Sequence, residues 1–120
     1  MDEAVRDALA NDRTIDITTT GRRSGEPRRI EIWIWRHDGR TYLSGAPGRR
    51  DWLANLRGNP EFTLHLKGSV RADLPATARP ITDDAERREL IPGILAELGR
   101  TPSNPEDWIA RSPLAEVEFS

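Results

Sequence analysis

The sequence contains no cysteine, which excludes disulfide bonds, thiolate metal ligands and cysteine nucleophiles and is typical of a reducing compartment. Histidine occurs only as His37 and His65, too few for a metal site built on histidine. The G-x-S-x-G, G-x-G-x-x-G and G-x-x-x-x-G-K-[ST] patterns are also missing. These absences argue against metal-dependent hydrolysis, serine-hydrolase chemistry and classical dinucleotide binding.

Long apolar runs are absent as well, so we expect no membrane span. The first twelve residues, MDEAVRDALAND, are acidic and polar, whereas a signal peptide begins with basic and then apolar residues. A cytoplasmic location is therefore expected.

A chain of 120 residues has the usual size of one domain, and four tryptophans with many aliphatic residues supply a core. We therefore expect a single domain over residues 1–120, in which residues 1–12 form an N-terminal helix or arm.

Lysine occurs once, so all but one of the 18 basic residues are arginine, whose planar fork suits bidentate capture of phosphate or carboxylate. A genome-wide bias towards arginine could explain this total, so the positions of the arginines must show whether they form a binding site. Six arginines fall in two short segments, 22–29 and 49–50, of a chain whose net charge is −2. This distribution indicates a local anion site, whereas the acidic total disfavours nucleic-acid binding.

Hydrophobic alternation at a period of two predicts strands at Thr14–Thr20, Arg29–Trp35 and Thr41–Ser44. A tight loop at 21–27 and an Asp-Gly turn at 38–39 join them into a meander. The isoleucines of the second strand should face the core, and its tryptophans the opposite side.

The second half predicts a helix at 49–57 closed by Gly58, a strand at 62–66, and a long strand or strand pair at 70–80 that Pro75 interrupts. The proline favours an edge or a bulge at that position. A helix capped by Thr82 or Asp83 is expected next, with a kink at Pro92. A helical turn at 107–111 and a strand at 114–119 follow it. About six antiparallel strands with few peripheral helices predict an α+β fold built on a small curled sheet or barrel.

Two loops favour anions. Gly21-Arg22-Arg23-Ser24-Gly25 joins two strands, and its guanidinium, hydroxyl and backbone N–H groups can converge on a phosphate. The stretch from Gly45 to Trp52 offers glycines, a helix N-terminus and two arginines. An ordinary solvated basic hairpin is the alternative for the first loop, and simple helix packing is the alternative for the second.

Blocks of sequence carry a resemblance to a known family. The blocks TTTGRRSGEPR (18–28), DGRTYL (38–43), WLANLRGNP (52–60) and ATARP (76–80) resemble, in order and spacing, the deazaflavin-dependent nitroreductase family, also called F420H2-dependent quinone reductase-like. The resemblance spans roughly residues 14–119. It implies a split β-barrel, and a hydride transfer from reduced coenzyme F420 to a quinone, nitroaromatic or activated alkene.

The cofactor of this family carries a phosphate and an oligoglutamate tail, both anionic, on a deazaflavin ring. By the resemblance, the phosphate or tail lies on Arg22, Arg23 and Ser24, and the ring is bordered by the segment from Arg28 to Trp33. The pocket is completed by Ser44 to Pro47 and Trp52 to Leu56. The cofactor-binding residues so implied are Arg22, Arg23, Ser24, Arg28, Arg29, Ile30, Glu31, Ile32, Trp33, Ser44, Gly45, Ala46, Pro47, Trp52, Leu53, Ala54, Asn55 and Leu56.

Two alternatives stay open: an FMN-binding reductase of the same fold, and a non-catalytic protein that binds an acidic or lipid ligand. The family's substrate-covering tyrosines have no clear match, because Tyr42 is the only tyrosine and the corresponding stretch offers Trp108. No catalytic residue or metal ligand is assigned. The expected partner is a small electron acceptor, and the resemblance implies a homodimer.

Overall fold

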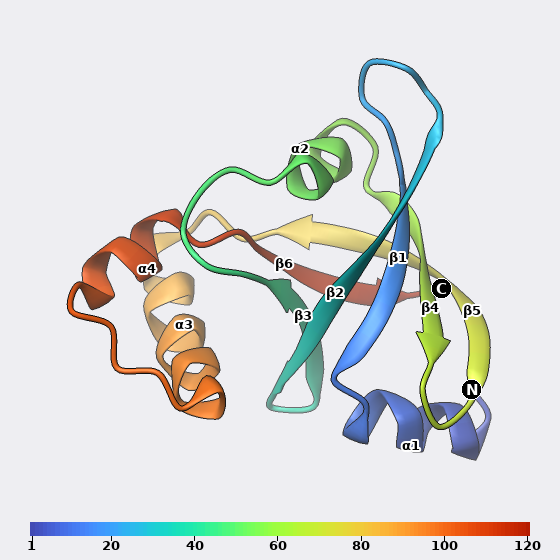
Figure 1. Cartoon of the computed structure of the whole chain (residues 1–120), viewed down its shortest axis with the longest axis horizontal. Helices are drawn as coiled ribbons and strands as arrows, with labels where there is room; N and C mark the ends of the chain where they lie inside the picture. Colours follow the sequence, from blue (N-terminus) through green and yellow to red (C-terminus); the bar gives the residue numbers. More distant parts are fainter.

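Six strands close into an antiparallel barrel in the computed structural model, which describes all 120 residues (Figure 1). The order around the barrel is β1-β2-β3-β6-β5-β4, so the first and fourth strands complete the ring. This is the predicted α+β split barrel. The strands are β1 (Thr14–Thr20), β2 (Pro27–His37), β3 (Arg40–Ser44), β4 (Glu61–Lys67), β5 (Arg71–Pro80) and β6 (Leu114–Phe119).

Four helices surround the barrel (Figure 1). Helix α1 (Glu3–Asn11) and helix α2 (Asp51–Gly58) lie at opposite ends, whereas α3 (Asp84–Leu98) and α4 (Pro105–Arg111) lie together beside it. None of them is both long and apolar enough to cross a membrane.

The barrel interior is the larger of two cores. Alternate residues of each strand point inward, as a period-two pattern requires, and α1 and α2 close the ends with Leu9, Trp52 and Leu56. Burying one such side chain stabilises the fold by about 2 kcal/mol. Fully buried members include Ile15, Ile17, Ile34, Leu43 and Leu64.

A second core lies outside the barrel, beneath α3 and α4. Trp35 and Tyr42 are opposite each other on β2 and β3 and project outward, where Ile91, Ile94 and Leu95 of α3 cover them. The aromatic face predicted for β2 is therefore half buried: Trp35 is 3% exposed, but Trp33 is 45% exposed.

The first half of β2 has a free edge. Residues 27–33 pair with β1, while the pairing of β2 with β3 begins at Ile34. The barrel is thus split on this side. Ile30 was expected in the core, but it is 36% exposed because no strand covers this edge.

Two sequence-based boundaries differ from the structure. Strand β5 runs without interruption through Pro75, which lies where β6 ends and accepts a hydrogen bond from the Ser120 N–H at 3.1 Å. The missing N–H of the proline therefore costs no ladder bond. Helix α2 starts at Asp51 and includes Gly58, so Asn59, in extended conformation, is its C-cap.

Helix α3 begins as predicted. The Asp83 carboxylate accepts the Glu86 N–H at 2.9 Å, which is one of the two predicted N-caps. The helix continues across Pro92 and ends at Gly99, whose φ of 66° is left-handed and suits glycine.

Candidate functional site

A groove of about 1020 Å³ runs between the tip of the β1–β2 hairpin, α2 and the adjoining ends of α3 and α4. We call it the arginine groove, because seven arginines line it against two aspartates. Its charged lining residues are Arg22, Arg23, Arg49, Arg50, Arg57, Arg87, Arg111, Asp51 and Asp84.

Arg22 is held in place by α2. The Asn55 side-chain oxygen accepts both the Arg22 backbone N–H at 3.2 Å and its guanidinium at 2.9 Å. Asn55 is 4% exposed and donates to the Thr19 hydroxyl at 3.2 Å, so the hairpin and helix form one rigid wall. Across the hairpin tip, the Ser24 hydroxyl accepts the Glu26 N–H at 3.1 Å.

Three groove arginines have side chains without any hydrogen-bond or ion-pair partner. Arg22 and Arg111 pair with Asp51 and Asp107, but the side chains of Arg23, Arg49 and Arg57 make no hydrogen bond or salt bridge. All three are exposed. Their charge is therefore available to an anion.

A fourth groove arginine, Arg87, has a buried guanidinium group. It is 9% exposed and donates to the backbone carbonyls of Ile109 at 2.6 Å, Ile81 at 2.7 Å and Ser112. Burial, and to a smaller extent the neighbouring charge of Arg57, lowers the pKa of this guanidinium. A bound anion would offset the repulsion between Arg57 and Arg87.

The loop before α2 is shaped by Arg50. Its guanidinium folds back to donate to the carbonyls of Ala46 and Arg49, each at 3.0 Å. Gly48 has a φ of 128°, a value that suits only glycine, and its N–H donates to the Arg111 carbonyl at 3.1 Å. Arg50 is also the N-cap of α2 but makes no side-chain capping bond. The first N–H groups of α2 at the groove are thus uncapped.

A smaller cleft of about 240 Å³ adjoins the groove, and Ser112 lines both. We call it the tryptophan cleft. Its wall is formed by Trp33, Trp35, Ser44, Gly45, Ala46, Ile91, Ile94, Leu98, Arg100, Trp108 and Ser112. The Trp35 indole N–H and the Ser112 hydroxyl are buried without any hydrogen-bond partner.

Indole rings shape the cleft. The rings of Trp33 and Trp35 lie 6.0 Å apart at 53°, and the Arg13 guanidinium lies 4.3 Å from the Trp35 ring centroid. This packing fixes the orientation of both rings. A flat ligand would therefore meet a preformed aromatic wall.

The structure distributes the sequence-predicted residues over four environments. Arg22, Arg23, Leu53 and Ala54 line the arginine groove, and Trp33, Ser44, Gly45 and Ala46 line the tryptophan cleft. Ile32, Trp52, Asn55 and Leu56 are buried, while Ser24, Arg28, Arg29, Ile30, Glu31 and Pro47 line neither space. Of this last group, Arg29 pairs with Asp16 at 3.0 Å, and Glu31 pairs with Lys67.

Several lining residues were missed. Arg57 lies one turn after Leu53 on α2, so its helical spacing could have indicated it. Arg87 lies in the first turns of the helix predicted after Asp83, and no local signal shows that it is buried. Arg100 and Ser112 come from distant segments that only the fold brings to the cleft.

Two other polar clusters lie apart from both spaces. Thr18, His65 and Asp73 form a chain of hydrogen bonds: the Thr18 hydroxyl lies 2.6 Å from His65 Nε2, and Asp73 lies 2.7 Å from His65 Nδ1. This chain of hydrogen bonds connects β1, β4 and β5 on the barrel exterior.

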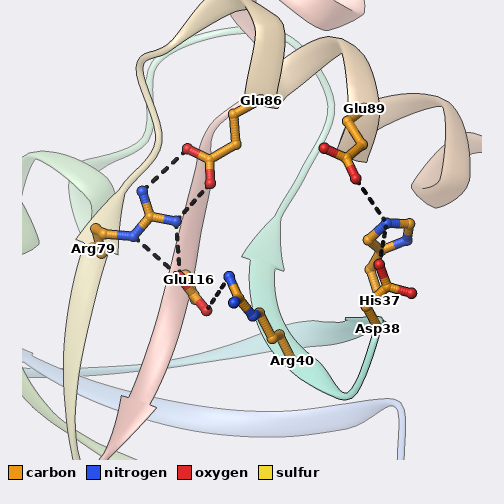
Figure 2. A network of polar contacts seen from close by, with 7 residues as sticks. All are labelled: His37, Asp38, Arg40, Arg79, Glu86, Glu89 and Glu116. Atoms are coloured by element: carbon orange, nitrogen blue, oxygen red, sulfur yellow. Dashed lines mark hydrogen bonds and ion pairs between the residues drawn. The ribbon is translucent and has the colours of Figure 1, made fainter.

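Figure 2 shows the second cluster, in which Asp38 and Glu89 approach His37 Nε2 at 3.6 and 3.8 Å. Both distances exceed those of hydrogen bonds.

The fold and the two adjoining spaces define a split barrel with an arginine-lined groove beside an aromatic cleft. Comparison with known families agrees with this class, since the model of the F420H(2)-dependent quinone reductase family matches residues 4–105. The chain belongs to this family, as the sequence blocks indicated. The family is one of oxidoreductases that use reduced coenzyme F420.

Solved structures share the fold. The F420-H2 dependent reductase FDR-A is 18% identical over 89% of this chain and 95% of its own, with a TM-score of 0.62. The heme storage protein HutZ from Vibrio cholerae is 13% identical over 97% and 87%, with a TM-score of 0.70. A chain described as a domain-swapped dimer is 20% identical over 89% and 81%, with a TM-score of 0.66. At these identities the likeness concerns the fold alone.

Proposed function

We propose that this protein is an F420-dependent reductase that passes a hydride to a small organic acceptor, namely a quinone, a nitroaromatic or an activated alkene. The observation that carries the proposal is the set of exposed groove arginines without acidic partners, in a chain of this family. When bound, reduced F420 supplies a hydride, and a quinone that also takes up one proton from solvent becomes a hydroquinone.

The residues of the groove suit the anionic part of this cofactor. Arg23, Arg49 and Arg57 offer free guanidinium groups to phosphate and glutamate carboxylates, and the N-terminus of α2 adds uncapped N–H groups. Arg22 is positioned by Asn55 to face the same space. The groove would therefore anchor and orient the cofactor, whereas it offers no comparable site to an apolar ligand.

The deazaflavin ring fits the boundary between the two spaces. Ser112 lines both spaces, Ser44 to Ala46 line the tryptophan cleft with Trp33, and the apolar wall of that cleft would exclude water from a bound ring. The chain's contribution to the reaction is then binding, orientation and shielding, because no side chain at this boundary is placed as an acid or a base.

A titration with F420 and, separately, with FMN tests the proposal through the fluorescence of the cleft tryptophans. F420 should bind wild type tightly, and Arg23→Ala/Arg49→Ala should weaken it by about tenfold or more, since two charged hydrogen bonds are lost. Arg71→Ala is the matched control, because Arg71 is exposed and unpaired but outside the groove.

The outcomes separate the alternatives. Binding of FMN but not F420 would indicate an FMN-binding reductase of the same fold. F420 binding without reduction of any quinone or nitro acceptor would indicate a binding protein. Equal affinity in the groove variant and the Arg71 variant would contradict the arginine groove as the anion site.

We also propose that the protein is a homodimer. The free edge of β2 carries Ile30 and Trp33, two of the three large hydrophobic residues that are exposed. Unpaired strand edges with apolar side chains pair readily with a second chain. The structurally similar chain described as a domain-swapped dimer supports self-association in this fold.

A further inference from the structure

One imidazole and two carboxylates converge where the β2–β3 turn meets α3, outside the groove and the cleft (Figure 2). His37 is the last residue of β2, Asp38 begins the turn, and Glu89 lies on α3. His37 Nε2 lies 3.6 Å from an Asp38 oxygen and 3.8 Å from a Glu89 oxygen, and all three atoms lie within 4.8 Å of one another. Because these distances are too long for hydrogen bonds, hydrogen bonding does not explain the convergence.

Neither carboxylate has an arginine partner, although arginine is abundant in this chain. Glu89 and Asp38 each have His37 as their one charged neighbour. The other three acidic residues of α3 all form salt bridges with arginine, in the pairs Arg88–Asp84, Arg79–Glu86 and Arg13–Glu97. Two carboxylates that approach each other without an arginine repel, and a cation bound between them would relieve that repulsion.

The backbone on both sides holds the three groups in position. Asp38 and Gly39, with φ of 50° and 74°, form a two-residue turn between His37 and Arg40, which pair across the hairpin. On the other side of the ring, a Cβ atom at Gly93 would lie 3.8 Å from His37 Nδ1. The Nδ1 side of the imidazole therefore lies against α3, while Nε2 faces the two carboxylates (Figure 2).

This set of donor atoms suits a divalent transition metal ion better than Mg²⁺ or Ca²⁺, which take oxygen ligands. Zinc binds imidazole nitrogen and carboxylate oxygen at about 2.0–2.2 Å, so two ligand atoms of a tetrahedral site lie roughly 3.3–3.5 Å apart. The observed distances of 3.6 and 3.8 Å are only slightly wider. The side chains of Asp38 and Glu89 are exposed and can close this difference.

We propose that His37, Asp38 and Glu89 form a zinc site, in which solvent water is the fourth ligand. Two histidines are too few for a site built on histidine, but here one imidazole is joined by carboxylates from two segments. The ion would bridge the β2–β3 hairpin and α3, a helix that lines both the arginine groove and the tryptophan cleft. The inference does not depend on the proposed reductase function, because no site residue lines either space.

Calorimetric titration of the full, tag-free chain with zinc chloride, after treatment with EDTA and desalting, tests this site. Wild type should bind one zinc ion per chain. His37→Gln, Asp38→Asn and Glu89→Gln should each weaken binding about tenfold or more, because each removes one of three protein ligands. The substitutions keep the approximate size of the side chains, and asparagine before glycine preserves the turn.

His65→Gln and Glu118→Gln are the matched controls. His65 is the only other histidine, and Glu118 is exposed on β6 without an ion pair. Both variants should bind zinc as wild type does. Zinc should also raise the urea midpoint of wild type and of both controls, but not that of Glu89→Gln, since a ligand that binds the folded state stabilises it.

The outcomes decide between a metal site and an ion pair. Loss of zinc affinity in all three site variants, with both controls unchanged, would establish the site. Equal zinc affinity in wild type and the site variants would overturn it and leave the cluster as an ion pair with a protonated His37. A loss in His65→Gln as large as that in His37→Gln would also overturn it, because zinc would then bind elsewhere.

Discussion

Arg87 shows how a single side chain connects stability to the candidate site. Its guanidinium donates to three backbone carbonyls that come from the connection between β5 and α3, from α4 and from the segment before β6. No carboxylate neutralises it. The residue therefore joins three segments of the groove wall while it leaves a positive charge for an anion.

Replacing Arg87 with methionine should destabilise the protein by about 3 kcal/mol, because three buried carbonyls lose their donor. Urea unfolding measures the change. Arg88→Met on the same helix is the control: Arg88 pairs with Asp84 and Glu106, but these pairs are exposed to solvent, which screens them, so their loss should cost little stability. Equal losses in the two variants would contradict a special role for Arg87.

At the scale of elements, a network of charges fastens α3 to the barrel (Figure 2). Arg79 of β5 lies opposite Glu116 of β6 and contacts it at 2.8 Å, and it also reaches Glu86 of α3 at 2.6 Å. Arg40 of β3 approaches Glu116 from the other side at 3.7 Å. Helix α3 supplies walls to both the groove and the cleft, so this network helps to position them.

The network predicts a dependence of stability on pH. The hydrogen bond from Arg79 holds the pKa of Glu86 below its ordinary value. A carboxyl whose pKa is lower in the folded state binds fewer protons there, so its stabilisation is present at neutral pH and is lost as the pH falls through the folded pKa. Glu86→Gln should therefore lose about 1 kcal/mol at neutral pH and less in acid.

Urea unfolding of both proteins across the acidic range measures this difference. Glu118→Gln serves as the control, because Glu118 is exposed on β6 without an ion pair. A constant difference between wild type and Glu86→Gln at every pH would show that the Arg79 contact does not depend on the charge of Glu86.

The sequence predicted the positions of strands and helices better than the burial and strand pairing of their residues. Period-two alternation located β1 and β6 at their observed bounds, since side-chain direction in a strand is a local property. The same alternation placed Ile30 in the core, but exposure at that position depends on whether another strand lies beside β2. The interruption expected at Pro75 did not occur, because a strand's register with its neighbours decides whether a missing N–H matters.

At the scale of the whole molecule, the groove and the cleft are assembled from segments that are far apart in the sequence. The β1–β2 hairpin, the loop before α2, α3 and the α4–β6 segment all contribute. A chain with a net charge of −2 thereby presents a concentrated positive surface. The free edge of β2 adds an apolar strip on the same molecule.

The proposed dimer gives a prediction at this scale. Ile30→Asp should convert a dimer to a monomer in light scattering after size exclusion, because a charge on the free edge opposes pairing with a second chain. Thr101→Asp adds the same charge at an exposed loop position and should leave the mass unchanged. A wild-type monomer at all concentrations would contradict the proposal.

The sequence by itself determined the strand and helix pattern, the α+β class and the family, because alternation, turn residues and the ordered blocks around Gly21 and Trp52 are local signals. It also indicated that arginines near the first hairpin and before α2 serve an anion. Only the tertiary structure decided that Arg57 and Arg87 join them, and that Trp35 and Ser112 share a cleft. The reason is physical: the burial of a charge and the absence of a hydrogen-bond partner depend on contacts between distant segments.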